Sequence, residues 1–330
     1  RDRLVNKSKI CIKPKNTKEI SKILKLANKF IIPIIPIGGS TGLVGGQIAS
    51  QSNHVTLSLE KLDTINFFKD SNLLYVQSGA ILSNIKKLAF NNGRLFPLSL
   101  ASEGSCQIGG NLATNAGGLN VIKYGNVRDL CLGLEAVLPC GQIVSTMKPL
   151  KKNNMGFDLK NLLIGSEGTL GIITSTILKT FPIPKDPVSI FLSINNLADV
   201  LFVFEKISRE FSERILAFEL IKMTGIDFIE ETGFTIKNPF NKKTNWKVLI
   251  EIDVNIGPIN LGEIIENTFY DLLLENKIVE VFFATNINQR NEFWKIRELI
   301  PAANRKKGSI CSNDISVPIE KIPEFINKLD

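Results

Sequence analysis

Residues 36–46 read PIGGSTGLVGG and hold five glycines within nine residues. The apolar run at residues 30–35, just before this stretch, predicts a buried strand. Glycine lacks a Cβ, so the backbone N–H groups of such a turn can approach a charged group closely and form a concave anion-binding nest. The hydroxyls of Ser40 and Thr41 add donors. The stretch therefore predicts a phosphate cradle at the end of a strand.

Two familiar phosphate loops do not fit this stretch. The glycines are not ordered as G-x-G-x-x-G, and no Lys-Ser or Lys-Thr follows them as in a Walker-type loop. A tight structural turn remains the alternative reading of these residues.

The composition is that of an ordinary globular protein with an excess of basic residues. The 330 residues suggest two domains, with 44% hydrophobic and 22% charged residues. The sequence contains no run of 18 apolar residues, so it predicts no membrane span, and its first residues do not resemble a signal peptide. The net charge of +8 comes from scattered lysines, which favours a solvated surface and an anionic substrate over a nucleic-acid partner.

Cysteine and histidine usage narrows the chemistry further. Five cysteines without a C-x-x-C spacing indicate neither a disulfide framework nor a zinc site, so we expect a reducing, cytoplasmic environment. His54 is the only histidine, so this chain by itself offers no histidine-rich metal site.

The chain order predicts an α+β protein in which strands and helices alternate. Up to residue 184 we expect strands at 10–12, 31–35, 55–59, 73–76, 133–138, 142–144 and 172–178, with helices at about 17–30 and 81–92. Residues 94–118 lack an apolar period and predict a long ligand-binding loop, with tight turns between short helices as the alternative. A proline-rich linker at 181–187 separates domains at 1–184 and 185–330.

The second domain has a more conventional core. Only 5 of the 24 glycines fall in it, so its elements follow the apolar period more closely. We expect strands at 188–194, 247–253 and 315–318, and helices at 198–211, 261–274 and around 294–298. Residues 235–245 predict an exposed polar loop.

Three glycine clusters in one domain predict a long ligand with phosphates, most simply a dinucleotide. Here the sequence resembles the flavin domain of the FAD-linked oxidases of the vanillyl-alcohol-oxidase and p-cresol-methylhydroxylase (PCMH) type. The resemblance rests on PIGGSTGLVGG, on SEGSCQIGGNLATNAGG with KYGNVRD, and on NNMGFDLKNLLIGSEGTLGIIT, in that order. Within this family the chain is most similar to FAD-dependent D-2-hydroxyacid dehydrogenases, the D-2-hydroxyglutarate group in particular.

The resemblance implies a two-subdomain PCMH-type FAD-binding domain, followed by an α+β substrate (cap) domain that is incomplete at its C-terminus. It implies that FAD is held without a covalent bond, since His54 does not match a histidine used for attachment. The implied FAD contacts are Pro36, Gly38, Gly39, Ser40, Thr41, Gly42, Gly45, Gly46, Pro97, Ser102, Gly104, Ser105, Ile108, Gly109, Asn111, Thr114, Asn115, Gly117, Gly118, Tyr124, Glu167, Gly168, Gly171 and Ile172.

For the substrate, the resemblance implies that Arg297, in a W-x-x-R-E motif, binds the carboxylate of a 2-hydroxyacid. Without that context, Arg297 reads equally well as an ion pair with Glu298 or Glu292 on a helix surface. Pro301 and Ser312 stand where the hydroxyglutarate group carries a threonine and a lysine, so the particular acid stays open, with Ser312 kept as a substrate contact.

The resemblance implies hydride transfer from the substrate to flavin N5 and then electron transfer to a quinone, an electron-transfer flavoprotein or a similar acceptor. It also places the family's histidine base and metal ligands in a stretch after residue 330, so we identify no catalytic residue here and expect zinc or another divalent metal only in a longer protein. The alternatives are a flavin-binding fragment or degraded relative without turnover and, on charge alone, a nucleotide- or nucleic-acid-binding protein. A homodimer and a location at the periphery of the inner membrane are further expectations.

Overall fold

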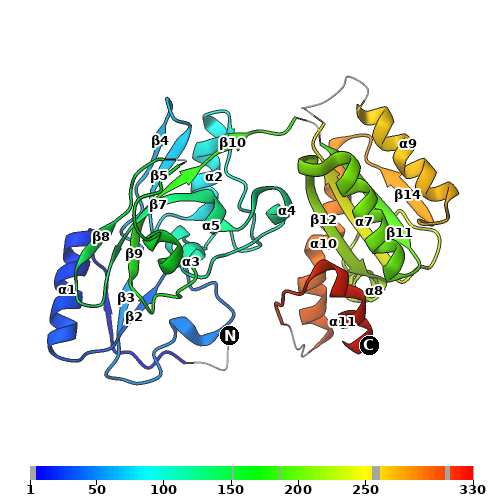
Figure 1. Cartoon of the computed structure of the whole chain (residues 1–330). Helices are drawn as coiled ribbons and strands as arrows, with labels where there is room; N and C mark the ends of the chain where they lie inside the picture. The colour runs from blue at the N-terminus through cyan, green and yellow to red at the C-terminus, as the bar shows by residue number, and fades with distance from the viewer. Residues whose placement is uncertain (1–4, 151, 186, 255–260, 309–312, 330) are drawn as a thin grey trace. The chain divides into compact units, whose positions relative to one another are not determined.

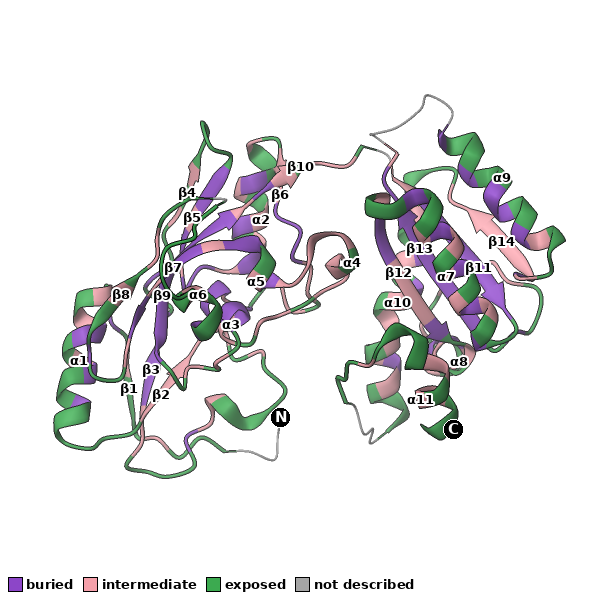
Figure 2. Ribbon diagram, viewed as in Figure 1, coloured by how far each residue is buried: buried purple, intermediate pink, exposed green. Residues whose placement is uncertain are grey.

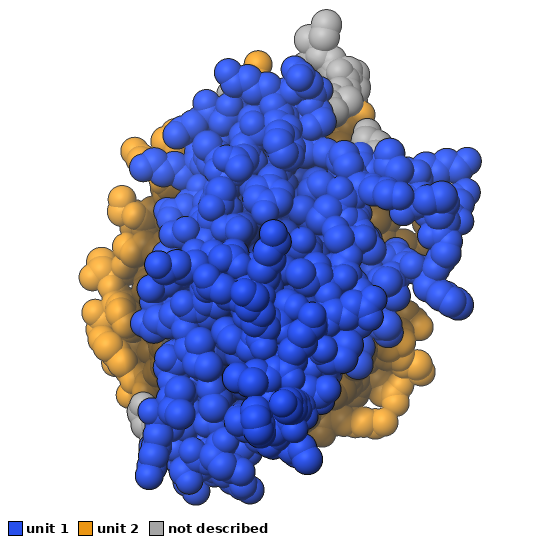
Figure 3. All heavy atoms as spheres, turned by 90° about the vertical axis from the view of Figure 1, so that its left-hand side faces the viewer, with its two compact units in different colours: residues 1–183 blue, residues 184–330 orange. Residues whose placement is uncertain are grey.

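The computed structural model describes residues 5–150, 152–185, 187–254, 261–308 and 313–329. It forms two compact units, Arg1–Ile183 and Pro184–Asp330, which Figure 3 shows in blue and orange. Each unit mixes helices and strands, which confirms the predicted α+β class (Figure 1). Within the described residues, no helix combines the length and the apolar character needed to span a membrane.

A small parallel sheet opens the first unit. Its strands run in the order β1-β3-β2, and helix α1 connects β1 to β2. The side chain of Asn16 caps α1 by accepting a hydrogen bond from the Glu19 N–H. The bounds are β1 (Ile10–Ile12), α1 (Thr17–Lys29), β2 (Ile34–Ile37), the short 3-10 turn η1 (Gly45–Gln47) and β3 (Val55–Ser58).

The predicted strand at residues 31–35 begins three residues too early. Phe30 and Ile31 are 59% and 88% exposed, and Ile31 has φ of 52°. The Ile32 N–H donates back to the Ala27 carbonyl, so this apolar run ends α1 in a left-handed turn instead of entering the sheet. Strand β2 itself starts after Pro33 and leads directly into the glycine loop.

A five-stranded sheet forms the rest of the first unit. Its order is β4-β5-β9-β7-β8, and all of its pairs are antiparallel. The bounds are β4 (Ile65–Phe68), β5 (Leu73–Gln77), α2 (Leu82–Asn91), β6 (Arg94–Leu95), α3 (Ile108–Ala113), α4 (Val121–Tyr124), α5 (Val127–Leu130), β7 (Cys131–Val137), β8 (Ile143–Ser145), α6 (Leu159–Leu163), β9 (Ile172–Lys179) and β10 (Phe181–Pro182). Its core contains Leu74, Ile85 and Phe96, all fully buried.

The three-stranded and the five-stranded sheet of this unit pack through α1 and β7. Val137 and Ile172 of the larger sheet share a buried cluster with Ile20 and Leu24 of α1. The Ser21 hydroxyl donates to the Gly141 carbonyl at 2.5 Å. The glycine loop after β2 is therefore fixed beside the ends of β7 and β9.

The second unit is an antiparallel sheet with helices on both faces. The strands run β12-β13-β11-β14. Alternate residues of β11 separate the faces, because Ile190, Leu192 and Ile194 pack with α7 and α9, whereas Phe191 packs with α8 and α10 (Figures 1 and 2). The bounds are β11 (Val188–Ile194), α7 (Leu197–Phe211), η2 (Ser212–Arg214), β12 (Ile215–Lys222), α8 (Met223–Glu231), β13 (Trp246–Ile252), α9 (Leu261–Leu274), β14 (Glu280–Phe283), α10 (Ile287–Lys307), η3 (Ile319–Lys321) and α11 (Ile322–Leu329).

Two further expectations are wrong. Residues 94–118 do not form one loop, because Arg94–Leu95 pairs with β10 and Ile108–Ala113 forms α3. Residues 315–318 have no regular structure, so the predicted strand there does not form.

Candidate functional site

The three glycine clusters, far apart in the sequence, meet at one hollow in the first unit. Its volume is about 130 Å³. The loop after β2, the helix α3 and the turn before β9 all line it. The residues are Pro36, Ile37, Gly38, Gly42, Val44, Gly46, Gln47, Leu59, Gly109, Gly110, Ala113, Thr114, Glu167, Gly168, Gly171, Ile172 and Ile173.

Close approach of neighbouring atoms explains why two positions in the first and second clusters are glycine. A Cβ on Gly39 would lie 2.0 Å from the Ser105 carbonyl oxygen, and one on Gly109 would lie 2.5 Å from the Ser78 Cβ. Real Cβ contacts are never this short, so any side chain would separate the first cluster from the second, or α3 from the sheet. Gly110 differs, because nothing lies within 4 Å of its missing Cβ.

Each cluster also holds one non-glycine residue in the left-handed region. Ser40, Asn115 and Glu167 have φ of 53°, 47° and 52°. Such residues are uncommon and concentrate at functional sites. The Glu167 N–H donates to the Ala113 carbonyl at 2.8 Å, which ties the third cluster to the end of α3.

Unpaired polar groups lie in the first and second glycine clusters. Within the described residues, the backbone N–H groups of Gly39, Ser40 and Gly42 have no acceptor. The buried oxygens Gln107 Oε1 and Asn111 Oδ1 likewise have no hydrogen-bond partner in that part of the chain. Buried polar atoms are nearly always paired, so these two need a partner from outside the protein or from water. A ligand with phosphates and with donor groups fits this set.

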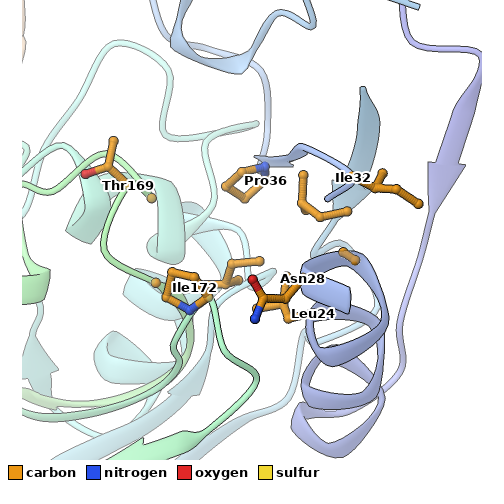
Figure 4. A pocket seen from close by; sticks show the side chains of 11 residues that line it. Leu24, Asn28, Ile32, Pro36, Thr169 and Ile172 are labelled. Carbon is orange, nitrogen blue, oxygen red and sulfur yellow. The ribbon is translucent and has the colours of Figure 1, made fainter. Parts of the chain in front are cut away.

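A second hollow of about 290 Å³, whose lining side chains Figure 4 shows, shares part of its wall with the first. Pro36, Gly168, Gly171 and Ile172 line both. Its other walls come from α1, from β2 and the turn before it, and from the turns after β7 and before β9: Leu24, Ala27, Asn28, Ile32, Ile34, Pro139 and Thr169. A long ligand can therefore extend from the glycine loop to the side of α1.

Of the predicted FAD contacts, those that line the first hollow are Pro36, Gly38, Gly42, Gly46, Gly109, Thr114, Glu167, Gly168, Gly171 and Ile172. The others do not line it: Gly39, Ser40, Thr41, Gly45, Pro97, Ser102, Gly104, Ser105, Ile108, Asn111, Asn115, Gly117, Gly118 and Tyr124. Two of these have evident structural contacts, since the Pro97 carbonyl accepts from Asn120 Nδ2 and the Tyr124 ring packs 4.7 Å from Phe181.

Sequence reasoning missed several lining residues and one buried amide. The missed residues of the first hollow are Ile37, Val44, Gln47, Leu59, Gly110, Ala113 and Ile173. Gly110 could have been predicted from the sequence, because it lies in the second glycine cluster beside Gly109. Gln107 gave no signal, because an isolated glutamine has no pattern.

The second unit has its own hollow, of about 320 Å³, around Arg297. Arg297 Nε donates to Glu219 Oε2 of β12 at 2.8 Å. The alternative reading, in which Arg297 pairs with Glu298 or Glu292, is wrong, since its partner is Glu219 and Glu292 approaches Lys295 instead. The hollow is lined by Glu219, Leu220, Ile221, Lys222, Gly225, Arg297, Ile300 and Pro301. Ser312 lies outside the described residues.

Lys247 is a buried cation on the same face of this sheet. It is fully buried, its Nζ donates to Thr244 Oγ1 at 2.5 Å, and Nζ lies 4.4 Å from the centre of the Phe240 ring. Burial lowers the pKa of Lys247, while the charges of Glu280 and Asp227 oppose that shift.

We expect Lys247→Met to be more stable than the parent chain at neutral pH, by about 1 kcal/mol, because burying a charge is costly. The folded state releases the lysine proton at a lower pH than the unfolded state, whose pKa is near 10.5. The parent chain therefore gains stability as the pH rises between these two pKa values, and the advantage of the variant should shrink.

Urea unfolding followed by tryptophan fluorescence measures both effects, since both tryptophans, Trp246 and Trp294, lie in the second unit. An advantage that stays constant from neutral pH to about pH 10 would contradict the assignment.

Comparison with known proteins agrees with this architecture. Residues 8–147 match the family model "FAD binding domain", and residues 183–330 match "FAD linked oxidases, C-terminal domain". The chain belongs to the family of FAD-linked oxidases. The family's cofactor is FAD, and the unpaired N–H groups and open glycine faces described above fit it.

Named relatives align with nearly all of the chain. A mitochondrial D-2-hydroxyglutarate dehydrogenase of Arabidopsis thaliana is 34% identical over 98% of the chain and 57% of its own length. That of Rattus norvegicus is 32% identical over 97% of the chain and 59% of its length. A putative mitochondrial D-lactate dehydrogenase of Schizosaccharomyces pombe is 34% identical over 97% and 61%. The chain thus spans about three-fifths of these relatives.

Solved structures confirm the fold. Alkyldihydroxyacetonephosphate synthase superposes with a TM-score of 0.68 at 21% identity, over 90% of this chain and 58% of that one. p-Cresol methylhydroxylase superposes with a TM-score of 0.67 at 15% identity, over 88% of this chain and 60% of that one.

Within the described residues, no group of three or more His, Cys, Asp or Glu side chains is placed to hold a metal ion.

Proposed function

We propose that this chain binds FAD without a covalent bond, and that the protein oxidises a D-2-hydroxyacid to the 2-oxoacid. D-2-Hydroxyglutarate is favoured as the substrate, with D-lactate or glycolate as alternatives. The observation that carries the proposal is the meeting of three glycine clusters at one hollow beside unpaired backbone N–H groups. The relatives' names support the substrate class.

The chain's own residues have separate tasks in this proposal. The loop at 38–46 holds the pyrophosphate through the N–H groups of Gly39, Ser40 and Gly42, whose donors have no protein acceptor in the described residues. Gln107 Oε1 and Asn111 Oδ1 accept hydrogen bonds from the cofactor. The hollow along α1 receives the adenosine end. FAD itself supplies the acceptor for the hydride.

Arg297 holds the substrate carboxylate in this proposal. Its guanidinium faces a hollow whose walls include Ile300 and Pro301, and its planar fork suits a carboxylate. We propose that Ser312 contacts the substrate as well.

We propose a quinone or an electron-transfer flavoprotein as the electron acceptor, and a homodimer as the assembly. The relatives are named as mitochondrial, and the cytoplasmic location remains a prediction.

A second candidate is a flavoprotein that binds FAD without turning over a hydroxyacid. One observation favours it: the single histidine, His54, lies beside β3 in the first unit. Loss of a hydride from an alcohol needs a base to take the hydroxyl proton, and His54 is the only imidazole that this sequence offers for that task.

An anaerobic titration distinguishes the two candidates. We expect the FAD-loaded chain to lose its flavin absorbance on mixing with D-2-hydroxyglutarate, and more slowly with D-lactate or glycolate, because hydride transfer reduces the flavin. L-2-Hydroxyglutarate and L-lactate are the controls and should leave the spectrum unchanged. Stable FAD absorbance with D-2-hydroxyglutarate, D-lactate and glycolate would contradict oxidation by this chain and favour the second candidate.

A further inference from the structure

Helix α10, which carries Arg297, is attached to its sheet by two carboxylates. Glu251 of β13 and Glu219 of β12 lie on the same sheet face, because Glu251 pairs with Ala217, two residues before Glu219. Their partners on α10 are Arg290, Trp294 and Arg297, spaced i, i+4 and i+7 along one side of the helix.

The two carboxylates differ in their surroundings. Glu251 is 4% exposed and is saturated, since it accepts hydrogen bonds from Arg290 Nε and Nη2, from Trp294 Nε1 and from the Ser189 hydroxyl. Among the described residues, the Glu219 carboxylate has one hydrogen-bond partner, Arg297 Nε, and the side chain is 23% exposed beside the hollow. Glu251 therefore fixes the helix, whereas Glu219 contacts only the arginine.

The contact with Glu219 leaves the other end of the guanidinium open. Within the described residues, Arg297 Nη1 and Nη2 have no hydrogen-bond partner, and Arg297 lines the hollow. An arginine fixed through Nε presents its two Nη groups as a preformed fork for a second carboxylate. An untethered arginine would have to lose side-chain freedom on binding, which weakens affinity.

We propose that Glu219 is a positioning residue for substrate binding: its carboxylate holds Arg297 through Nε so that the Nη pair receives the carboxylate of the 2-hydroxyacid. This inference rests on the proposed function. It assigns Glu219 no part in the chemistry, because Glu219 acts through Arg297 and does not itself touch the substrate.

Calorimetric titration of the FAD-loaded full chain with pyruvate and with 2-oxoglutarate tests this role without needing turnover. We expect Glu219→Ala to weaken binding of these 2-oxoacids about fivefold, because the tether is lost. Glu219→Gln keeps an acceptor for the Nε–H and lacks the negative charge that repels the ligand, so its affinity should equal or exceed that of the parent chain.

The matched control is Glu205→Ala on α7, which removes an exposed pair with Arg209 at 2.9 Å and should leave binding unchanged. Should Glu219→Ala lose its fold by circular dichroism, Glu219→Met, which keeps the side-chain length, takes its place. If Glu219→Ala binds as tightly as the parent chain, or if Glu219→Gln loses as much affinity as Glu219→Ala, the role of Glu219 is overturned. Neither outcome would contradict the proposed function. A parent chain that binds neither 2-oxoacid would instead contradict the proposed function and this inference with it.

Discussion

Replacing Gly110 with leucine is expected to abolish FAD binding while the chain remains folded. Gly110 lies on α3, lines the hollow where the glycine clusters meet, and has no atom within 4 Å of its missing Cβ. The Cβ of a leucine there would be free of neighbouring protein atoms within 4 Å, so we expect the rest of the side chain to project into the space assigned to the cofactor. The ratio of flavin to protein absorbance after reconstitution measures the loss.

A matched control separates blocking of the site from damage to a helix. Gly262 is also a helical glycine with nothing within 4 Å of its missing Cβ, but it lies on the exposed side of α9 in the second unit. Gly262→Leu should bind FAD in the same ratio as the parent chain. Stoichiometric FAD in Gly110→Leu would show that the ligand does not occupy this hollow. Gly39 would be a poor choice for this test, because its Cβ would clash with the Ser105 carbonyl and disturb the fold itself.

Elements with a clear apolar period could be predicted from the sequence. Helix α9 has the predicted bounds, 261–274, and α7 begins one residue before the predicted start. The same rule was wrong at Ile31, where an apolar residue is 88% exposed in the turn that ends α1. Apolar composition shows which residues can be buried, but chain reversal decides which ones are.

Tertiary contacts explain the elements that the sequence did not reveal. Helix α3 has two glycines in six residues and no apolar stripe, and Gly109 is required by the approach of Ser78 from a distant turn. Residues 315–318 have a strand-like pattern, but a strand needs a neighbour, and the sequence does not show whether one is present.

The candidate site divides in the same way. The glycine clusters identified the ligand class, because their composition carries the chemistry. The partner of Arg297 could not be found, since Glu219 lies 78 residues away and sequence reasoning considers neighbours on the same helix. The buried oxygen of Gln107 was missed for a related reason, because burial is set by the whole fold.

Replacing Arg290 with leucine is expected to destabilise the second unit by about 3 kcal/mol, because it leaves the Glu251 carboxylate buried without a cation. Arg290 contacts both carboxylate oxygens, at 2.6 and 3.1 Å, and the Glu251 side chain is only 5% exposed. Urea unfolding followed by tryptophan fluorescence reports this unit directly, since Trp246 and Trp294 are the two tryptophans of the chain.

Two further variants identify the cause of that loss. Arg209→Leu removes an arginine from the exposed α7 pair, whose side chains are 77% and 71% exposed, and should change stability by less than about 0.5 kcal/mol. Adding Glu251→Gln to Arg290→Leu removes the unpaired charge while keeping an acceptor for Trp294 and Ser189, so the double variant should be more stable than Arg290→Leu alone. If the second substitution instead lowers stability further, the cost lies in lost packing of the arginine, and α10 is not held in place by the charge of Glu251.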